Sequence, residues 1–276
     1  MEWLAPSSLD QACDLRAQHG AATTVLAGGS FLGILMNQGF LSPTSLLSLA
    51  RVDELKTISV REGQLCLGAM VSHREVERHA AVRSDWPVLA YAFGLVASPR
   101  VRNQATVGGV LADADYASDP PAILSALNAR AVLRSPRGER EVAIDELIVG
   151  FYETCIAEDE LLTEVRVPAL TGPATYRKFR SRSREDRPCV AVAAAHDGAT
   201  LRVVVGACAE VPQHYPDICA QADAGLAGAA REIGAGYAAR LQPLTDARGS
   251  GEYRRRVVAV EVRRAIEALA GRDEAT

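Results

Sequence analysis

The sequence predicts an α+β protein of two domains, on three observations. Its 276 residues exceed what one compact core usually needs, since domains commonly run to about 100–200 residues. Helical patterns and β-hairpin patterns both recur along the chain. A Thr-Gly-Pro run at residues 171–173 then interrupts these patterns and is the best candidate for a linker. We therefore expect one domain at residues 1–170 and a second at 174–276.

The composition is that of a globular protein, with 48% hydrophobic and 23% charged residues. Thirty basic residues against 34 acidic residues leave a net charge of −4, which argues against a general nucleic-acid binder. No segment approaches the ~20 apolar residues of a membrane span, and the N-terminus lacks the basic and apolar regions of a secretory signal. We expect a cytoplasmic protein without a transmembrane segment.

The six cysteines and five histidines are scattered along the chain. The cysteines form no CxxC pair, so the sequence predicts buried thiols in a reducing compartment and neither a zinc nor an iron–sulfur site. His73 and His79 are six positions apart, which puts them on different faces of a helix. We expect the histidines to be surface or capping residues, and we expect no metal site on this chain.

The first domain is expected to open with a helix and then a strand. Ser7 or Ser8 can cap the helix and Gly20 suits its end. Residues 23–26 are β-branched and apolar and predict the strand. The other elements expected here are a hairpin over residues 55–68, a helix from the Ser72–Glu75 capping box to about His79, a buried helix over 86–97 that Pro99 ends, a loop over 100–109, a hairpin over 131–144 and a strand over 161–167.

The second domain is expected to hold three strands followed by two helices. The strands are predicted at residues 176–179, 190–195 and 201–205, and the Asp197-Gly198 pair is typical of a hairpin turn between the last two. One face of the final helix is apolar, through Val258, Val262, Ala265, Ile266 and Leu269. Four arginines lie off that stripe and are expected on a solvated face: Arg254, Arg255, Arg263 and Arg264.

Two glycine pairs carry the main chemical signal. Gly28 and Gly29 follow the predicted strand and precede Ser30, while Gly108 and Gly109 follow Thr106. Consecutive glycines let backbone N–H groups converge into a nest that binds phosphate oxygens, and the two hydroxyls add donors. Two such nests could hold a diphosphate, although each pair alone is also typical of an ordinary tight turn. The GxGxxG and Walker motifs are absent, so a Rossmann domain is not supported.

Three acidic residues, Asp113, Asp115 and Asp119, fall within seven positions before two prolines. One of them could accept hydrogen bonds from ribose hydroxyls. Alternatively, they order their own backbone as an Asx-type turn. A metal site is less favoured, because no histidine lies nearby and the spacing is not that of an EF-hand.

Several motifs, in order, resemble the FAD-binding subunits of molybdenum hydroxylases. Residues 26–30 resemble that family's AGG-x-S loop, although the serine here directly follows the glycines. Residues 101–109 resemble its VRN-x-x-T-[IV]-GG loop, and residues 115–121 resemble the segment that follows. Further matches cover nearly the whole chain, at residues 129–133, 137–140, 160–168, 176–179 and 248–255.

The resemblance implies a particular α+β fold. The first domain would be a two-lobed FAD-binding domain of the vanillyl-alcohol-oxidase (PCMH) type, with lobes at about residues 1–54 and 55–170 and with FAD between them. The second would be a C-terminal α+β domain with a three-stranded antiparallel sheet.

The resemblance also implies a set of FAD-contacting residues and no catalytic residue on this chain. A cation such as Lys178 near the flavin would stabilise its reduced anion. Two departures stand out, because Val110 replaces a usual asparagine and Arg187 replaces a tyrosine found beside the flavin in some relatives. The residues implied are Ala27, Gly28, Gly29, Ser30, Phe31, Leu32, Val96, Thr106, Val107, Gly108, Gly109, Val110, Asp119, Leu161 and Lys178.

The function that the resemblance implies is electron transfer within a larger enzyme. A molybdopterin-binding large subunit and a [2Fe–2S] small subunit would be the partners, in a dimer of heterotrimers. Electrons would pass from the cluster through FAD to NAD, a quinone or dioxygen. Two alternatives stay open: a stand-alone FAD-dependent oxidoreductase, and a non-catalytic scaffold that has lost FAD.

Overall fold

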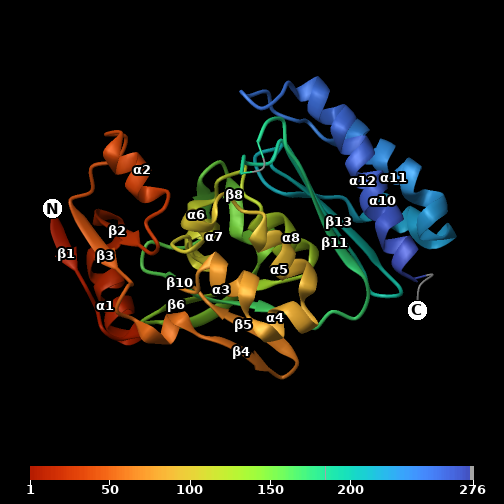
Figure 1. Cartoon of the computed structure of the whole chain (residues 1–276). Coiled ribbons are helices and arrows are strands. Elements are labelled where there is room, and N and C mark those ends of the chain that lie inside the picture. Colours follow the sequence, from red (N-terminus) through yellow and green to blue (C-terminus); the bar gives the residue numbers. More distant parts are fainter. Residues whose placement is uncertain (184, 274–276) are drawn as a thin grey trace. The chain divides into compact units, whose positions relative to one another are not determined.

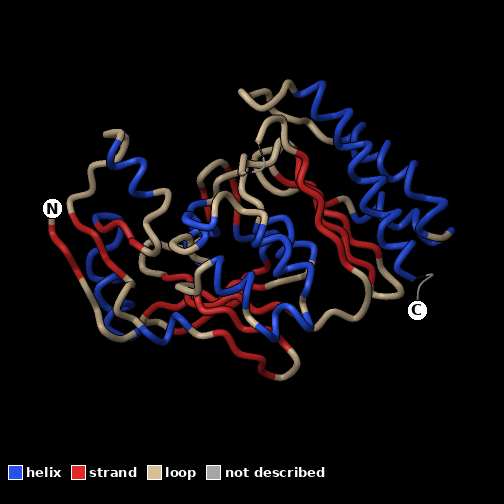
Figure 2. The backbone as a smooth tube through the Cα atoms, in the orientation of Figure 1, coloured by secondary structure: helices blue, strands red, loops and turns tan. Residues whose placement is uncertain are grey.

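The computed structural model describes residues 1–183 and 185–273 of the chain (Figure 1). Contacts within the chain define two compact units. The first unit comprises residues 1–76, 98–114 and 129–168, and the second comprises residues 77–97, 115–128 and 169–276. The domains expected at 1–170 and 174–276 stay a prediction. The strands of both units are drawn in red in Figure 2.

The first unit begins with a small parallel sheet of order β1-β3-β2, formed by β1 (Glu2–Leu4), β3 (Ser45–Ser48) and β2 (Thr23–Leu26). Helix α1 (Leu9–His19) begins where the Ser8 hydroxyl accepts the N–H of Gln11 and ends at Gly20, as predicted. Its buried side chains pack against the sheet in a cluster of Ala12, Cys13, Leu47, Leu49, Val52, Leu55 and Leu161.

The larger sheet of the first unit is antiparallel throughout, with the order β4-β5-β10-β6-β7. It confirms both predicted hairpins and the predicted strand at residues 161–167. Its strands are β4 (Ile58–Arg61), β5 (Gln64–Gly68), β10 (Leu161–Val167), β6 (Arg130–Ser135) and β7 (Gly138–Ala143). A short two-stranded sheet adds β8 (Ile148–Gly150) and β9 (Glu153–Thr154).

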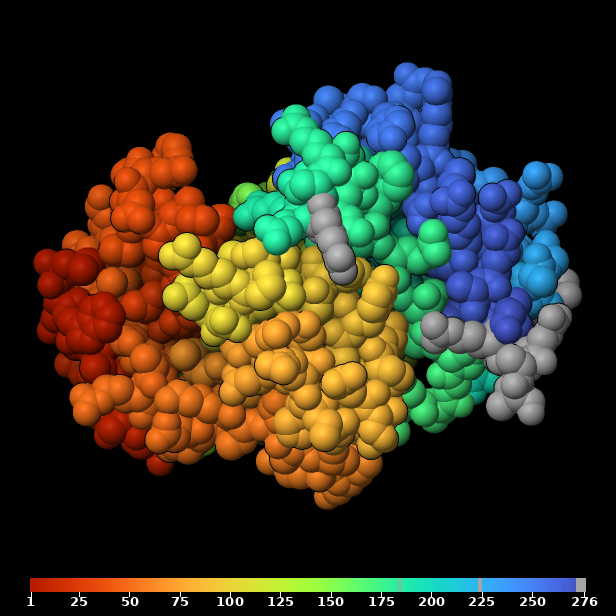
Figure 3. All heavy atoms as spheres, in the orientation of Figure 1, coloured from red at the N-terminus to blue at the C-terminus, as the bar shows by residue number. Residues whose placement is uncertain are grey.

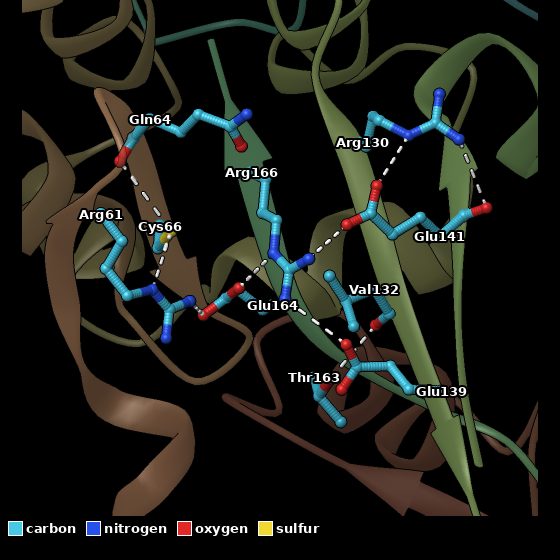
Figure 4. A network of polar contacts seen from close by, with 10 residues as sticks. All are labelled: Arg61, Gln64, Cys66, Arg130, Val132, Glu139, Glu141, Thr163, Glu164 and Arg166. Atoms are coloured by element: carbon cyan, nitrogen blue, oxygen red, sulfur yellow. Dashed lines mark hydrogen bonds and ion pairs between the residues drawn. The ribbon is translucent and has the colours of Figure 1, made fainter.

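One face of this sheet carries partly exposed charged side chains, and Figure 4 shows the contacts among them. Glu164 and Arg166 alternate along β10 with the buried residues Val165 and Val167, so the strand has one face toward the core and one outward. Arg166 pairs with Glu164 on its own strand and with Glu141 on β7, so an ion pair connects the two strands that flank β6. Because these side chains are partly exposed, the ladder adds little to stability and mainly keeps the outer face polar.

The remaining helices and 3-10 turns of the first unit are short. They are η1 (Gly20–Ala22), α2 (Leu32–Asn37), η2 (Asp53–Lys56), α3 (His73–Arg78, which runs on into the second unit), α6 (Pro99–Arg102), α7 (Val107–Asp113) and α9 (Ile144–Leu147). The capping box before α3 is confirmed, because the Ser72 N–H donates to Glu75 and the Glu75 N–H donates to the Ser72 hydroxyl.

The expected loop over residues 100–109 is wrong, because α6 and the start of α7 occupy most of it. Pro99 begins α6 and does not end the preceding helix, which spans Pro87–Gly94 and stops short of the expected residue 97. The Ser98 hydroxyl accepts the N–H of Val101, and a proline at the first helical position costs no hydrogen bond. Thr106 then caps α7. Because charged residues and glycines are mixed at these positions, the sequence pattern did not indicate the two short capped helices.

The second unit is built on an antiparallel sheet of order β11-β12-β13-β14. The three predicted strands are its long ones, and a two-residue strand is added at one edge. The strands are β11 (Ala174–Phe179), β12 (Val190–His196), β13 (Leu201–Gly206) and β14 (Gln213–His214).

Helices cover both faces of this sheet. The core of one face joins alternate residues of β12 and β13, such as Val192 and Val203, to α11 and α12. On the other face Gly206 lies against Ala122 of α8, where a Cβ would approach the Ala122 methyl group to 2.9 Å. The helices and the 3-10 turn of this unit are α4 (Ala80–Asp85), α5 (Pro87–Gly94), α8 (Pro120–Ala126), α10 (Pro216–Cys219), η3 (Ala220–Ala224), α11 (Leu226–Arg240) and α12 (Gly251–Asp273).

The apolar stripe predicted for the final helix is confirmed, since all five of its residues are buried. The expectation of a solvated arginine face is wrong for Arg254, whose side chain is fully buried. Its guanidinium donates to the Asp246 carboxylate and to the carbonyl oxygen of Ala207, so burial leaves the charge paired. Within the part of the chain that the structure describes, no helix has both the length and the apolar character needed to cross a membrane.

Candidate functional site

The first glycine loop lies at the carboxyl end of β2, in a parallel sheet. The carboxyl ends of parallel strands are where open α/β sheets commonly bind ligands. Gly29 has φ +69°, a conformation that suits glycine, and α2 begins three residues later. Residues 27–32 are all partly exposed, and α2 has no buried residue and contributes to the surface in Figure 3. The loop therefore offers its backbone and the Ser30 hydroxyl to a ligand.

The structure brings the two glycine loops together within the first unit. A Cβ on Gly28 would lie 1.7 Å from the carbonyl oxygen of Gln104 and 3.3 Å from Cγ2 of Thr106. A Cβ on Gly109 would lie 3.6 Å from Cβ of Ala27. Glycine at position 28 is thus required by the close approach of the second loop.

The second loop is not an open nest, because its N–H groups are already used. Val107 donates to the carbonyl oxygen of Val71 at 2.9 Å, and Gly108 donates to that of Ala69 at 2.8 Å. Gly109 donates to the Thr106 hydroxyl at 3.1 Å. A Cβ on Gly108 would also lie 2.6 Å from Cβ of Ala69. Gly108 and Gly109 therefore allow the second loop to pack closely against its neighbours. A direct contact of residues 106–110 with a diphosphate stays a prediction.

His73 supports the second loop from α3, contrary to the expected surface or capping role. Its side chain is buried, its ring Nε2 lies 3.2 Å from the carbonyl oxygen of Thr106, and its backbone N–H donates to that of Ala105. Burial lowers the pKa of His73, the Thr106 carbonyl opposes this and nearby Arg102 adds to it, and together they bring the pKa to about 4. The imidazole is therefore neutral near pH 7.

A buried ion pair connects two of the predicted residues in the second unit. Lys178 on β11 donates to Asp119 at 2.9 Å and to the carbonyl oxygen of Leu95 at 2.9 Å. Tyr176, two residues earlier on the same strand, donates to the other Asp119 oxygen at 2.6 Å. Three predicted positions thus come together here, since Val96 directly follows Leu95.

Burial raises the pKa of the Asp119 carboxyl, and Lys178 and Tyr176 oppose that rise. Burial and the neighbouring carboxylate raise the pKa of Tyr176 well above its ordinary value, so its hydroxyl keeps the proton that it donates. The ammonium group of Lys178 lies opposite the Asp119 carboxylate in an ion pair of 2.9 Å. Tyr176 was not among the predicted site residues, although its position two residues from Lys178 on one strand was a readable signal.

The segment before Asp119 confirms the predicted Asx-type turn. One oxygen of Asp115 accepts the N–H of Ala117 at 3.0 Å, and the other pairs with Arg187 at 2.5 Å. Arg187 therefore pairs with the carboxylate that forms this turn. The replacement of tyrosine by arginine at this position did not indicate that role. Among the described residues no group of histidine, cysteine and acidic side chains could hold a metal ion.

Leu161, another predicted site residue, lies in a hydrophobic cluster of the first unit. It begins β10, and its side chain is buried in the cluster that joins α1 to the small sheet. A contact between Leu161 and a flavin stays a prediction from resemblance.

Comparisons with known proteins agree with this geometry. Residues 1–170 match the family described as "FAD binding domain in molybdopterin dehydrogenase". The nicotine 6-hydroxylase medium subunit of Paenarthrobacter nicotinovorans is 31% identical over 275 residues, which covers 96% of each chain. The chain belongs to the FAD-binding medium subunits of the molybdenum hydroxylase family. It is accordingly a subunit of an oxidoreductase, with an FAD-binding domain of the PCMH type.

Solved structures of this family match the medium-subunit fold over its whole length. A chain in the crystal structure of the Cu,Mo-CO dehydrogenase in its cyanide-inactivated form has a TM-score of 0.92 at 27% identity, covering 99% of this chain and 98% of that one. A chain of the carbon monoxide dehydrogenase from Hydrogenophaga pseudoflava has a TM-score of 0.88 at 30% identity, covering 99% and 98%.

The predicted site residues of the medium subunit carry chemical groups that suit FAD. The first loop holds Gly29 in the left-handed conformation, the Ser30 hydroxyl and partly exposed backbone, which are groups that can bind a diphosphate. The buried Asp119–Lys178 pair holds a carboxylate and an ammonium group in fixed positions. A contact of this pair with the flavin stays a prediction from the resemblance.

Proposed function

We propose that this medium subunit transfers electrons within a heterotrimeric molybdenum hydroxylase. It would receive them from a [2Fe–2S] small subunit and deliver them to NAD, a quinone or dioxygen. The observation that carries the proposal is the junction of the two glycine loops, with Gly28 packed on Gln104 and Gly109 beside Ala27. Similarity over the full length to chains named as medium subunits supports it.

Bound FAD would supply the redox chemistry, because a flavin exchanges electrons one or two at a time. The chain's own residues would hold and tune it. Residues 27–32 would bind the diphosphate, and the second loop would fix their conformation by packing against them. Asp119 and Lys178 would present a paired charge to the cofactor, as the resemblance predicts. His73, neutral near pH 7, would keep the second loop in place.

The partners that we propose are a molybdopterin-binding large subunit and a [2Fe–2S] small subunit, assembled as a dimer of heterotrimers. The names of similar proteins, such as the nicotine 6-hydroxylase medium subunit, describe one subunit of an enzyme with several. The small subunit would bring the iron–sulfur clusters and the large subunit the molybdenum cofactor.

Expression alone and together with the neighbouring subunits tests this function. Alone, the chain should purify with FAD and without molybdenum or iron, and should not hydroxylate purines, aldehydes or carbon monoxide. Together, the subunits should elute as one complex with molybdenum, iron and flavin. A metal-free homo-oligomer that oxidises a small substrate unaided would instead favour a stand-alone oxidoreductase. A colourless chain that binds no added FAD would favour the scaffold.

A further inference from the structure

Residues 115–119 connect α7 to α8 and carry Asp119, yet they are held by side chains from much later in the sequence. All of the contacts that follow lie within the second unit. Three of the five residues are anchored: Asp115, Tyr116 and Asp119. We call these five residues the Asp119 segment.

The first anchor is the pair of Asp115 and Arg187. Asp115 is buried, and its Oδ2 lies 2.5 Å from Nη1 of Arg187, which is partly exposed. The other carboxylate oxygen of Asp115 accepts the N–H of Ala117. Arg187 therefore stabilises the carboxylate that shapes the turn.

The second anchor is Tyr116, which binds a loop directly before α12. Its hydroxyl donates to Oδ2 of Asp246 at 2.9 Å and accepts from Nη2 of Arg248 at 2.6 Å. The Arg248 guanidinium also lies over the Tyr116 ring, 5.4 Å from its centroid. Hydrogen bonding and a cation–π contact thus hold the same side chain.

The loop that holds Tyr116 is itself fixed by the core of the second unit. The fully buried Arg254 donates to Oδ1 of Asp246 at 2.6 Å, and the backbone N–H of Arg248 donates to the same oxygen at 2.7 Å. Burial alone would raise the pKa of Asp246, but the Arg248 N–H, the Tyr116 hydroxyl and the two guanidinium groups bring it down to about 2. Asp246 therefore stays charged across the physiological range.

We propose that Arg187, Asp246 and Arg248 are positioning residues for FAD, acting through the Asp119 segment. The contacts of Asp115, Tyr116 and Asp119 fix five residues whose backbone entropy would otherwise be lost at the moment of binding. With the segment ordered in advance, FAD meets Asp119 already in place. The inference rests on the proposed FAD-binding function and extends it to residues outside the FAD-binding domain match at 1–170.

The test compares four variants of the full-length chain, after FAD has been removed and titrated back by flavin fluorescence. Tyr116→Phe removes the hydroxyl that binds Asp246 and Arg248. Arg187→Gln removes the positive charge that pairs with Asp115. Arg187→Lys is the conservative rescue. Arg240→Gln is the matched control, because Arg240 also makes an ion pair in the second unit, with Asp217 at 2.7 Å, away from the segment. Hydrogen exchange of the amides of residues 115–119 and the thermal midpoint are measured on the same samples.

Tyr116→Phe and Arg187→Gln should each weaken FAD binding about tenfold and speed amide exchange in the segment. Arg187→Lys should restore most of the affinity, and Arg240→Gln should change neither quantity. A general loss of stability would lower the thermal midpoint and speed exchange throughout the chain, without selecting the segment, and would overturn the proposal. So would wild-type affinity and exchange in both variants. A wild-type chain that takes up no FAD would refute the proposed function itself, and the inference with it.

Discussion

The ammonium group of Lys178 lies 2.9 Å from the carboxylate of Asp119, and both side chains are almost completely buried. A pair in this position differs from an isolated cation beside a flavin. The two charges pair with each other, and each makes one further hydrogen bond, Asp119 with the Tyr176 hydroxyl and Lys178 with the Leu95 carbonyl. The pair is therefore both a structural element of the second unit and, in the proposed function, an electrostatic element of the cofactor site.

Breaking this pair should destabilise the protein strongly. Lys178→Met or Asp119→Asn each leaves one buried charge without its partner, at a cost of about 3–5 kcal/mol. Urea unfolding of each variant measures this loss. The double variant Asp119→Asn/Lys178→Met should lose much less than the sum of the two, since it removes both charges. Additive losses would mean that the two side chains do not stabilise one another.

The same two variants should move the flavin reduction potential in opposite directions. Lys178→Met removes the cation and leaves the carboxylate, which disfavours the reduced flavin anion and lowers the potential. Asp119→Asn leaves the cation uncompensated and raises it. Spectroelectrochemical titration of FAD-loaded protein measures both. Shifts of the same sign, or none, would show that the pair does not lie near the flavin.

The pKa of His73 predicts a dependence of stability on pH. The unfolded histidine titrates near pH 6.5, but burial holds the folded pKa at about 4. Between these values the unfolded chain binds more protons, so stability is present above pH 6.5 and is lost as the pH falls toward 4, by up to about 3 kcal/mol. Denaturant unfolding at several pH values measures the slope.

His73→Gln should flatten this slope, because glutamine does not titrate and its amide can still donate to the Thr106 carbonyl. His19→Gln is the control, since His19 is partly exposed at the end of α1 and should leave the slope unchanged. An unaltered slope in His73→Gln would assign the acid sensitivity to other groups.

Local patterns predicted most of the elements, because hairpins, caps and apolar stripes depend on neighbours in the sequence. The Ser8 cap of α1, the hairpin at Asp197-Gly198 and the stripe of α12 are of this kind. Arg254 was placed wrongly because periodicity separates faces of a helix but does not reveal a buried partner eight residues away. The ion pair of Lys178 with Asp119 joins residues 59 positions apart, which no local pattern encodes.

The glycine loops show the same limit in a different form. The Gly-Gly pairs correctly indicated two special turns, but the sequence did not reveal that Gly108 approaches Ala69 or that the N–H groups of residues 107–109 are already bonded. These facts depend on the path of β5 and of the turn that follows it. They explain why two similar sequence signals have different physical roles.

The last prediction concerns Gly28. Gly28→Ala places a methyl group 1.7 Å from the carbonyl oxygen of Gln104, a distance that only a backbone shift can relieve. The two loops should separate, with a loss of about 1–3 kcal/mol in the free energy of unfolding, as for overpacked cores. The ratio of flavin to protein absorbance should fall well below that of the wild type, because the first loop no longer presents its donors in one arrangement.

Gly228→Ala is the matched control, since a Cβ at this position of α11 meets nothing within 4 Å. It should keep full FAD and lose no stability, since Gly228 lies in the first turn of α11 and alanine is a better helix former than glycine. If Gly28→Ala loses stability but keeps stoichiometric FAD, the junction of the loops is structural only, and the diphosphate must be held elsewhere. If it loses FAD with little change in stability, the shape of the first loop is what the cofactor recognises.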